Sequence, residues 1–365
     1  MTPAEALARL RLARTEGVGP VMVRRLLARH GSAERALAAL PRLGGRPLAP
    51  APEAGAAREM EALARLGGRF LFAGTPGYPP LLDLLEDAPP ALAVLGDPAA
   101  LAPRAVALVG ARNASAAGRR IAEELAGALA RAGLVVVSGL ARGVDAAAHL
   151  GALRAGRTVA AIAGGLDRPY PPENAALQAR IAAEGGAVVA EAPLGTAPLA
   201  RHFPRRNRIV AGLALGVVVV EAAPRSGSLI TARLALEAGR ELFAVPGSPL
   251  DPRCRGSNDL IRQGAHLTET AEDVLAHLPQ APRAAPPLAP RRAPPPRPAA
   301  EEPPPPAGAH GQVLELLGPS PIAVDDLLRR CHLSPAAVQA VLLELELAGS
   351  VEMLPGNRVA LTGRG

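Results

Sequence analysis

The chain has 365 residues, enough for two or three domains of ordinary size. All 40 basic residues are arginine, and they exceed the 33 acidic residues, so the formal net charge is +7. This excess favours a polyanionic partner, although a basic protein without one is an equal alternative on charge alone. Hydrophobic residues make up 49% of the chain and aromatic residues only 2%, which predicts an aliphatic core.

The sequence gives no indication of secretion or membrane insertion. Its first fourteen residues mix acidic, basic and apolar side chains, unlike a signal peptide. No run of about 18 apolar residues occurs, so we expect no membrane span. Cys254 and Cys331 lie far apart and form no CxxC motif, which argues against a disulfide framework or a zinc site. We therefore expect a cytoplasmic protein with no metal or other cofactor.

Residues 1–66 are rich in alanine and have helical periodicity, which predicts an N-terminal helical domain of the SAM or helix-hairpin-helix kind. Within them, Gly17-Val18-Gly19-Pro20 separates two helical stretches. It resembles the hairpin of helix-hairpin-helix modules, in which glycines expose backbone N–H groups to a phosphate. A plain turn between helices is the alternative, and such short glycine patterns favour it.

Residues 67–280 alternate strands with helices. The predicted strands are apolar throughout, which is typical of strands that helices cover on both faces. We therefore predict an α/β domain with a Rossmann-like, doubly wound, mainly parallel sheet. Its strands are expected at residues 105–110, 134–139, 158–165, 187–193, 216–223 and 241–247.

The C-terminal part begins with a change of composition. Residues 281–307 are mostly proline, alanine and arginine; they cannot bury a core and are predicted to be an extended linker. Residues 308–365 regain helical periodicity and end in a predicted hairpin around Pro355-Gly356-Asn357. Three helices followed by a hairpin is the order of a winged helix. Ser334 and Pro335 suit the N-cap and first position of its third helix.

The turns after the predicted strands are candidate ligand sites, because doubly wound sheets bind ligands at the carboxyl ends of their strands. Each turn combines glycine with hydroxyl groups, arginine or a second glycine, which suits the binding of an anion by backbone N–H groups. The turns are Gly110-Ala111-Arg112-Asn113, Ser138-Gly139-Leu140-Ala141-Arg142-Gly143, Gly164-Gly165 and Ser226-Gly227-Ser228.

These turns do not suit a dinucleotide. The first turn lacks GxGxxG, and the second strand ends in Ser138 where an NAD site has an acid for the ribose. The chain also lacks GxxxxGK[ST], which excludes a P-loop NTPase.

The segment RHFPRRNR is the densest basic cluster of the chain. Single-stranded DNA binding requires cations along the phosphate backbone and an aromatic ring for a base, and this segment supplies both. The alternative is that the phenylalanine belongs to the core and the arginines pair with acids. The residues concerned are Arg201, Phe203, Arg205, Arg206, Asn207 and Arg208.

Three titratable side chains are weaker candidates. Asp145 and His149 are four residues apart on a predicted helix, as in a metal site or an acid–base pair. Because no third ligand is evident, we favour an ion pair or hydrogen bond that stabilises the helix. Glu221 ends a strand of valines; it could bind a ligand, but we favour a structural hydrogen bond from the Ser226–Thr231 turn.

Several of these segments, in this order, resemble the bacterial DNA-processing DprA family, also called Smf. The resemblance implies a homodimer, formed through the Rossmann-like domain, that binds and protects single-stranded DNA in natural transformation and loads RecA onto it. It implies no catalytic reaction. The segments are VGARNAS, SGLARGVDAAAH, GGLDRPYPPEN, HFPRRNRIVAGL, VVVVEAAPRSGSLITARLALEAGRELFAVPG and GSNDLIRQGA.

The resemblance also implies which residues bind DNA. The family pocket uses the arginine of the first turn, here Arg112, and the phenylalanine and basic residues of the FP-x-RNR segment. Two positions depart from the family pattern: Ala111 replaces a serine, and Arg201 takes the place of a lysine before the FP pair. The expected pocket residues are Arg112, Phe203, Arg205, Arg206 and Arg208, with Gly110, Ser115, Ser138, Gly139 and Arg142 lining the same groove.

Two other functions compete with DNA binding. One is an enzyme that hydrolyses nucleoside monophosphates, with Glu221 or Glu237 as the acid, although the PGGxGTxxE motif of such enzymes is absent. The other is a structural adaptor assembled through the winged helix and the linker. The predicted third helix of the winged helix contains no basic residue, which argues against major-groove binding and favours an interaction or regulatory role.

Overall fold

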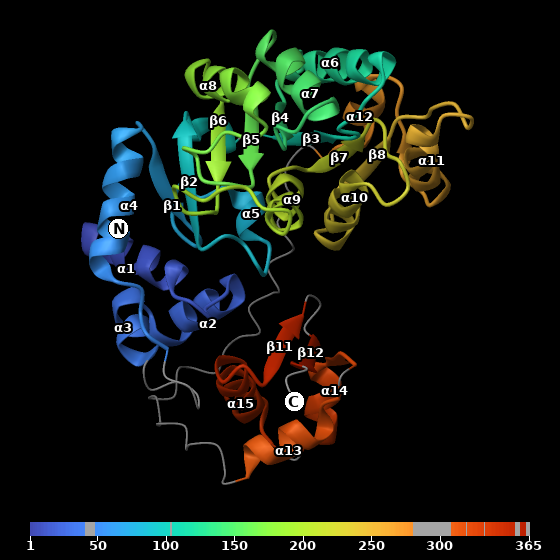
Figure 1. Cartoon of the computed structure of the whole chain (residues 1–365). Helices are drawn as coiled ribbons and strands as arrows, with labels where there is room; N and C mark the ends of the chain where they lie inside the picture. The colour runs from blue at the N-terminus through green and yellow to red at the C-terminus, as the bar shows by residue number, and fades with distance from the viewer. Residues whose placement is uncertain are drawn as a thin grey trace. The chain divides into compact units, whose positions relative to one another are not determined.

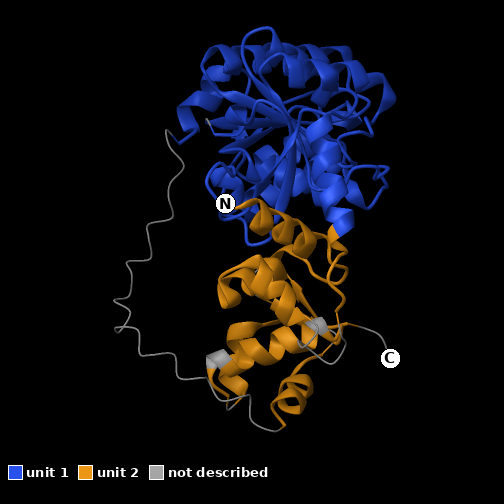
Figure 2. Cartoon of the chain, turned by 90° about the vertical axis from the view of Figure 1, so that its left-hand side faces the viewer, with its two compact units in different colours: residues 1, 54–284 blue, residues 2–53, 285–365 orange. Residues whose placement is uncertain are grey.

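The structure is a computed structural model that describes residues 1–40, 48–102, 104–279, 308–318, 320–331, 333–354 and 358–362. Its contacts divide the chain into two compact units: residues 1 and 54–284, and residues 2–53 and 285–365 (Figure 2). The helix α4 (Glu53–Arg65), expected within an N-terminal domain 1–66, buries Leu63 against the central sheet. The expected linker 281–307 lies outside the described residues, and the domain boundaries stay predictions.

Three short helices form the first part of the chain: α1 (Pro3–Arg14), α2 (Pro20–His30) and α3 (Ala33–Ala39). The side chains of Thr2 and Ser32 cap α1 and α3 by accepting backbone N–H groups. Gly17 lies between α1 and α2 with a φ of 80°, a left-handed conformation that favours glycine. The predicted turn between two helices is therefore present at this position.

The central unit contains a nine-stranded sheet with the strand order β1-β2-β6-β5-β4-β3-β7-β8-β9 (Figure 1). Neighbours from β6 to β9 are parallel, whereas β2 is antiparallel to both β1 and β6. This confirms the predicted doubly wound, mainly parallel sheet. The strands are β1 (Arg69–Phe72), β2 (Ala91–Gly96), β3 (Ala105–Val109), β4 (Val135–Ser138), β5 (Thr158–Ile162), β6 (Ala187–Ala190), β7 (Gly216–Val219), β8 (Glu241–Ala244) and β9 (His266–Leu267).

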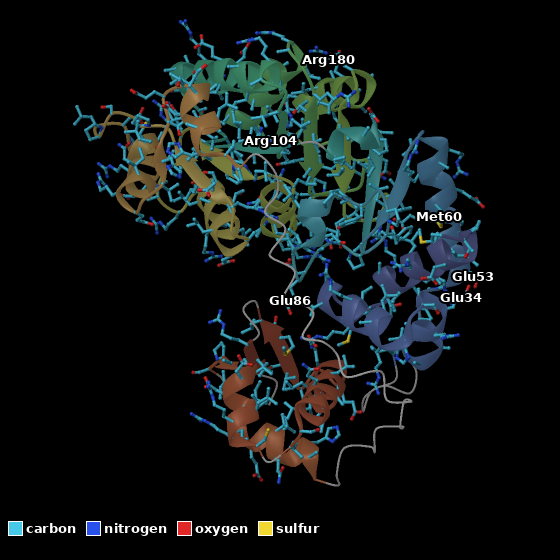
Figure 3. The ribbon with its side chains drawn as sticks, turned by 180° about the vertical axis from the view of Figure 1, so that it is seen from behind. Glu34, Glu53, Met60, Glu86, Arg104 and Arg180 are labelled. Carbon is cyan, nitrogen blue, oxygen red and sulfur yellow. The ribbon has the colours of Figure 1, made fainter. Side chains whose placement is uncertain are left out.

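Helices cover both faces of the sheet, as the uniformly apolar strands predict. Along β3, Val106 and Leu108 pack toward α6 and α7, while Ala107 and Val109 pack toward α9 and α10. Arg104, labelled in Figure 3, joins the start of β3 to the end of α12 by donating to the Pro279 carbonyl oxygen (3.0 Å). The helices of this unit after α4 are α5 (Pro80–Asp83), α6 (Ala116–Arg131), α7 (Val144–Leu153), α8 (Ala175–Ala183), α9 (His202–Gly212), α10 (Gly227–Glu237), α11 (Arg255–Arg262) and α12 (Ala271–His277).

The C-terminal residues form the predicted winged helix. Ser334 caps the third helix by accepting the Ala337 N–H (3.1 Å), and the predicted turn 355–357 lies outside the described residues. None of the described helices is long and apolar enough to span a membrane. The elements are α13 (Ala309–Leu316), β10 (Ile322–Ala323), α14 (Val324–Arg330), α15 (Pro335–Leu347), β11 (Val351–Leu354) and β12 (Arg358–Leu361).

His149 is part of the core of the central unit. Its ring is fully buried, and Nδ1 donates to Thr158 Oγ1 (2.7 Å), which in turn donates to the Val136 carbonyl oxygen (2.7 Å). Nε2 has no hydrogen-bond partner among the described residues, so the predicted bond between His149 and Asp145 is wrong. Burial, reinforced by the charge of Arg206, lowers the pKa of His149 to about 3.

This lowered pKa predicts that His149 makes stability depend on pH. The unfolded chain takes up a proton below about pH 6.5 and the folded chain does not, so stability is lost as the pH falls. Between pH 7.5 and pH 5.0 the loss from this residue is about 2 kcal/mol. Glutamine cannot titrate, so we expect the free energy of unfolding of His149→Gln to fall by about 2 kcal/mol less than that of the wild type between pH 7.5 and pH 5.0. Urea unfolding followed by circular dichroism measures this difference. Equal pH sensitivity of both proteins would contradict the assignment.

Candidate nucleic-acid interface

A groove of about 1210 Å³ in the central unit lies at the carboxyl ends of β3, β4 and β5. The turns after these three strands contribute Arg112, Gly139 and Gly164 to its wall. It then continues along α6 and α7. The groove thus occupies the edge of the sheet at which the sequence predicts a ligand.

One end of the groove carries two aromatic rings. Phe203, in the first turn of α9, and Tyr170 meet edge to face with their centroids 5.7 Å apart. The guanidinium carbon of Arg112 lies 4.8 Å from the centre of the Phe203 ring, a cation–π contact. Phe203 is only partly buried, so it belongs to the groove wall and not to the core.

The groove is positively charged. Seven arginines and three glutamates line it. Arg142 pairs with Glu173 (2.9 Å), Arg120 pairs with Glu124 (2.8 Å), and Arg154 pairs with Glu123. The other groove arginines are Arg168, beside Asp167, and Arg112, Arg119 and Arg131, which have no ion pair with any described residue.

The RHFPRRNR segment is the start of helix α9 and is not a loop. The first turn of α9 reaches the groove through Phe203, whereas the second turn is buried. Arg206 is 6% exposed and donates from Nη1 to the carbonyl oxygens of Gly139 and Ala161 (2.7 Å for Ala161). Burial lowers its pKa to about 10, and it remains charged at neutral pH. Arg206 therefore does not line the groove but stabilises the strand ends that form it.

Two other arginines of this segment bind a common carboxylate. Arg208 is buried; its Nη2 lies 2.6 Å from Glu191 and its Nε lies 3.3 Å from Asp87. Arg205 is exposed and forms a two-pronged pair with Glu191 (3.0 and 3.1 Å). The buried Asn207 donates to the Gly227 carbonyl oxygen (3.2 Å). None of the three lines the groove, nor does the exposed Arg201.

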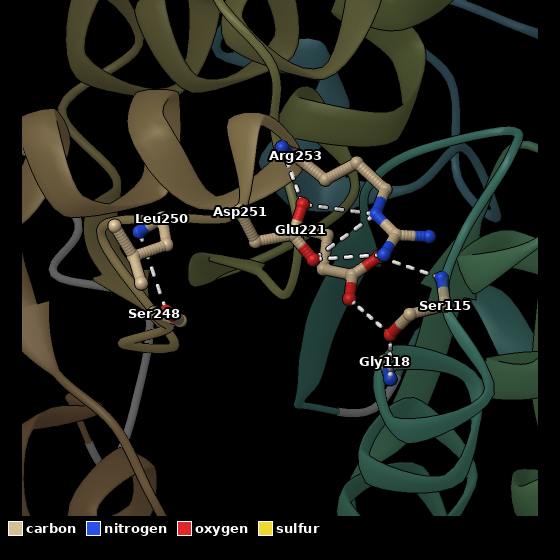
Figure 4. Close-up of polar contacts among 7 residues, drawn as sticks. All are labelled: Ser115, Gly118, Glu221, Ser248, Leu250, Asp251 and Arg253. Carbon is tan, nitrogen blue, oxygen red and sulfur yellow. Dashed lines mark hydrogen bonds and ion pairs between the residues drawn. The ribbon is translucent and has the colours of Figure 1, made fainter.

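The N-terminus of α6, beside the point where the strand order reverses, is occupied by the protein's own acid. Glu221, buried at the end of β7, accepts the Ser115 N–H (2.9 Å) and hydroxyl (2.5 Å), as Figure 4 shows. A Cβ on Gly118 would lie 2.4 Å from the Glu221 carboxylate carbon, so the helix can approach only with glycine there. Glu221 thus has the favoured structural role, but its partner is Ser115 and not the Ser226–Thr231 turn.

The remaining predicted residues shape the protein beneath the groove. Gly110 is closely packed, because a Cβ there would lie 2.6 Å from Val144. Ser138 is buried and donates to the Leu108 carbonyl oxygen (2.6 Å). Gly139 lines the groove and leaves no room for a Cβ beside Arg206. In the turn before α10, the hydroxyls of Ser226 and Ser228, on either side of Gly227, hydrogen bond to each other (2.8 Å).

Asp145 and Glu237 are not among the residues that line the groove. Asp145 is buried beside Arg206 and accepts the Ala141 N–H (3.3 Å); burial raises its pKa, partly offset by Arg206. Glu237 is exposed and lies 3.6 Å from Arg233. Among the described residues, no three His, Cys, Asp or Glu side chains lie close enough together to hold a metal ion.

Sequence reasoning missed Tyr170 and the arginines of α6 as groove residues. Tyr170 lies in the quoted segment GGLDRPYPPEN, and as one of two tyrosines in the chain it could have been found as a second aromatic. Arg119 and Arg131 both lie on α6 and line the groove, and their separation is a multiple of the four-residue spacing at which helix residues are neighbours.

The buried position of Arg206 predicts a large effect on stability. Arg206→Met removes the donor from two carbonyl groups and leaves Asp145 without its neighbouring charge, which we expect to cost about 3 kcal/mol. Arg205→Met, its exposed neighbour in the sequence, is the control and should cost less than about 1 kcal/mol. Urea unfolding at pH 7.5 measures both. Losses of similar size would contradict the buried role of Arg206.

Comparisons with known proteins agree with this architecture. The family model described as DNA recombination-mediator protein A matches residues 69–279. A DprA-like N-terminal HHH domain matches residues 3–62, and a DprA winged helix domain matches residues 293–357. Protein Smf of Escherichia coli (strain K12) is 41% identical over 285 residues, which cover 78% of this chain and 75% of that protein.

Solved structures resemble the same chain. DprA from Streptococcus pneumoniae has a TM-score of 0.63 at 33% identity and covers 77% of this chain and 99% of its own. DNA processing protein A from Helicobacter pylori, whose structure concerns its single-stranded DNA binding mode, has a TM-score of 0.51 at 31% identity. The match covers 57% of this chain and 94% of that one. The chain therefore belongs to the DprA family of DNA recombination mediators, as the order of its motifs predicts.

Proposed function

We propose that this protein binds single-stranded DNA in the groove at the carboxyl ends of β3, β4 and β5. The observation that carries the proposal is the cluster of Phe203, Tyr170 and Arg112, because it places a ring for a base beside a cation for a phosphate. Tyr170 is 41% exposed and Phe203 is partly buried, so the pair has ring surface on which a base can stack. Arg142 and Gly139, on the neighbouring turn, line the same groove.

The proposal divides the predicted residues into two groups. Arg112 and Phe203 contact DNA directly, with Arg142 on the neighbouring turn of the same groove, whereas Arg201 lies outside the groove. The second group acts through the structure that it supports, because each of its side chains forms at least one hydrogen bond within the protein. It comprises Arg206, Arg208, Asn207, Ser115 and Ser138. Arg205 would reach a phosphate only by leaving Glu191.

Stacking and phosphate contacts carry little sequence information, so we expect weak base preference and strong salt dependence. The excess of arginine along the groove agrees with that mode of binding. The Helicobacter pylori relative, whose structure concerns its single-stranded DNA binding mode, supports the same substrate.

Family membership supports a proposal for the wider role of the protein. We propose that the protein protects single-stranded DNA in the cytoplasm, loads RecA onto it during natural transformation, and acts as a homodimer through its Rossmann-like domain. Stimulation of RecA filament formation on DNA by the wild-type protein, and its loss in Arg112→Ala, would test the loading step. Sedimentation of the full chain would test the dimer.

The binding site predicts the effect of two substitutions. Phe203→Leu removes a stacking ring, which is worth about 1–3 kcal/mol per base, and should weaken binding about 5- to 150-fold. Arg112→Ala should weaken binding and reduce its salt dependence. Fluorescence anisotropy with labelled oligo-dT measures both, and Arg180→Ala, on α8 outside the groove, is the control. Wild-type affinity in both groove variants would overturn the proposed site.

A nucleotide-hydrolysing enzyme is the alternative function, and the structure favours it less. Its first candidate acid, Glu221, is engaged by Ser115, and its second, Glu237, is exposed on α10 outside the groove. We therefore expect no free base when the protein is incubated with nucleoside monophosphates and the products are separated by chromatography. Base release above a protein-free blank would contradict this expectation.

A further inference from the structure

The groove does not end at the aromatic cluster but continues along α6. Arg119, Glu123, Gly127 and Arg131 all line it and are spaced four residues apart, so each is a neighbour of the next along the surface of the helix. At a rise of about 1.5 Å per residue, Arg119 and Arg131 are about 18 Å apart along the helix axis. We call this second part of the groove, which these four residues of α6 line, the track.

Small residues form the floor of this track. Gly127 of α6 and Ala147 and Gly151 of α7 line it. A Cβ on Gly151 would lie 2.1 Å from the Glu123 carbonyl oxygen, so the backbones of the two helices are in direct contact. Among the described residues, the aromatic side chains that line the groove are Tyr170 and Phe203, at its other end. The track can hold an extended chain but offers no ring on which a base could stack.

The charges of the track are only partly neutralised. Arg154 of α7 pairs with Glu123, and Arg120 pairs with Glu124. Arg119 and Arg131 are exposed, line the groove, and have no acidic partner among the described residues. Two unpaired guanidinium groups, one toward each end of the track, suit a flexible ligand with regularly spaced negative charges.

We infer that a single DNA strand held at Phe203 continues along α6, where Arg119 and Arg131 bind its phosphates without contact to its bases. This inference rests on the proposed DNA binding and adds a second, electrostatic segment to that site. Continuity of the groove with its aromatic end, where the DNA strand is proposed to bind, favours DNA over an acidic protein segment as the occupant.

The test compares a short and a long oligonucleotide. We expect Arg119→Ala/Arg131→Ala to bind dT6 like the wild type, because dT6 is held at the aromatic end, but to bind dT18 about tenfold more weakly. The plot of log affinity against log salt concentration should become less steep by about 1.4 for dT18 but not for dT6, because two phosphate contacts are lost. The ratio of the two affinities is compared between proteins, since a longer oligonucleotide also offers more binding registers.

The control removes the same charge elsewhere. Arg180→Ala/Arg233→Ala removes two exposed arginines of α8 and α10, which lie outside the groove, and should leave both affinities unchanged (Figure 3 labels Arg180). An unchanged dT18 affinity in the Arg119/Arg131 variant would overturn the inference and leave the track to another acidic ligand. An equal loss in the control would overturn it too. Unchanged dT6 binding by Arg112→Ala and Phe203→Leu would instead refute the proposed function.

Discussion

The groove depends on one buried cation. The Arg206 guanidinium donates to carbonyl oxygens at the ends of β4 and β5, and Asp145 of α7 lies beside it. It thereby joins helix α9 to two strands and a helix that are separate in sequence. Phe203 lies three residues before it on α9, almost one turn away, so the contact that holds Arg206 also fixes the position of the ring. A binding ring held on a rigid element is more precisely placed than one on a loop.

Burial separates the arginines of this protein into two kinds. Arg206 and Arg208 have lost their water and are bonded to carbonyl or carboxylate oxygens, where losing a partner would leave an uncompensated buried group. Arg112, Arg119 and Arg131 are exposed and without acidic partners among the described residues, so they can exchange counterions for a phosphate at little cost. The same logic explains Glu221: an internal carboxylate at the N-terminus of α6 replaces the anion that a dinucleotide-binding fold would take from its ligand.

The sequence predicted the sheet, the ligand-binding edge and the winged helix, because each rests on local patterns. Uniformly apolar strands such as 216–219 can be recognised without knowing their neighbours, and so can the Ser334 N-cap. The burial of Arg206 and Arg208 could not be predicted, because their partners Gly139, Ala161 and Glu191 are distant in sequence and burying an arginine contradicts its usual preference. The Ser115–Glu221 contact was missed for the same reason, since 106 residues separate its partners.

The most direct test of this account is a crystal structure of the full chain with a short oligo-dT. The account predicts a thymine on the Phe203 ring, a phosphate at Arg112, and Arg206 still bonded to Gly139 and Ala161 beneath the groove. DNA bound along Arg205 and Arg208, outside the groove, would contradict the account. So would an Arg206 side chain that has left Gly139 and Ala161 and binds a phosphate.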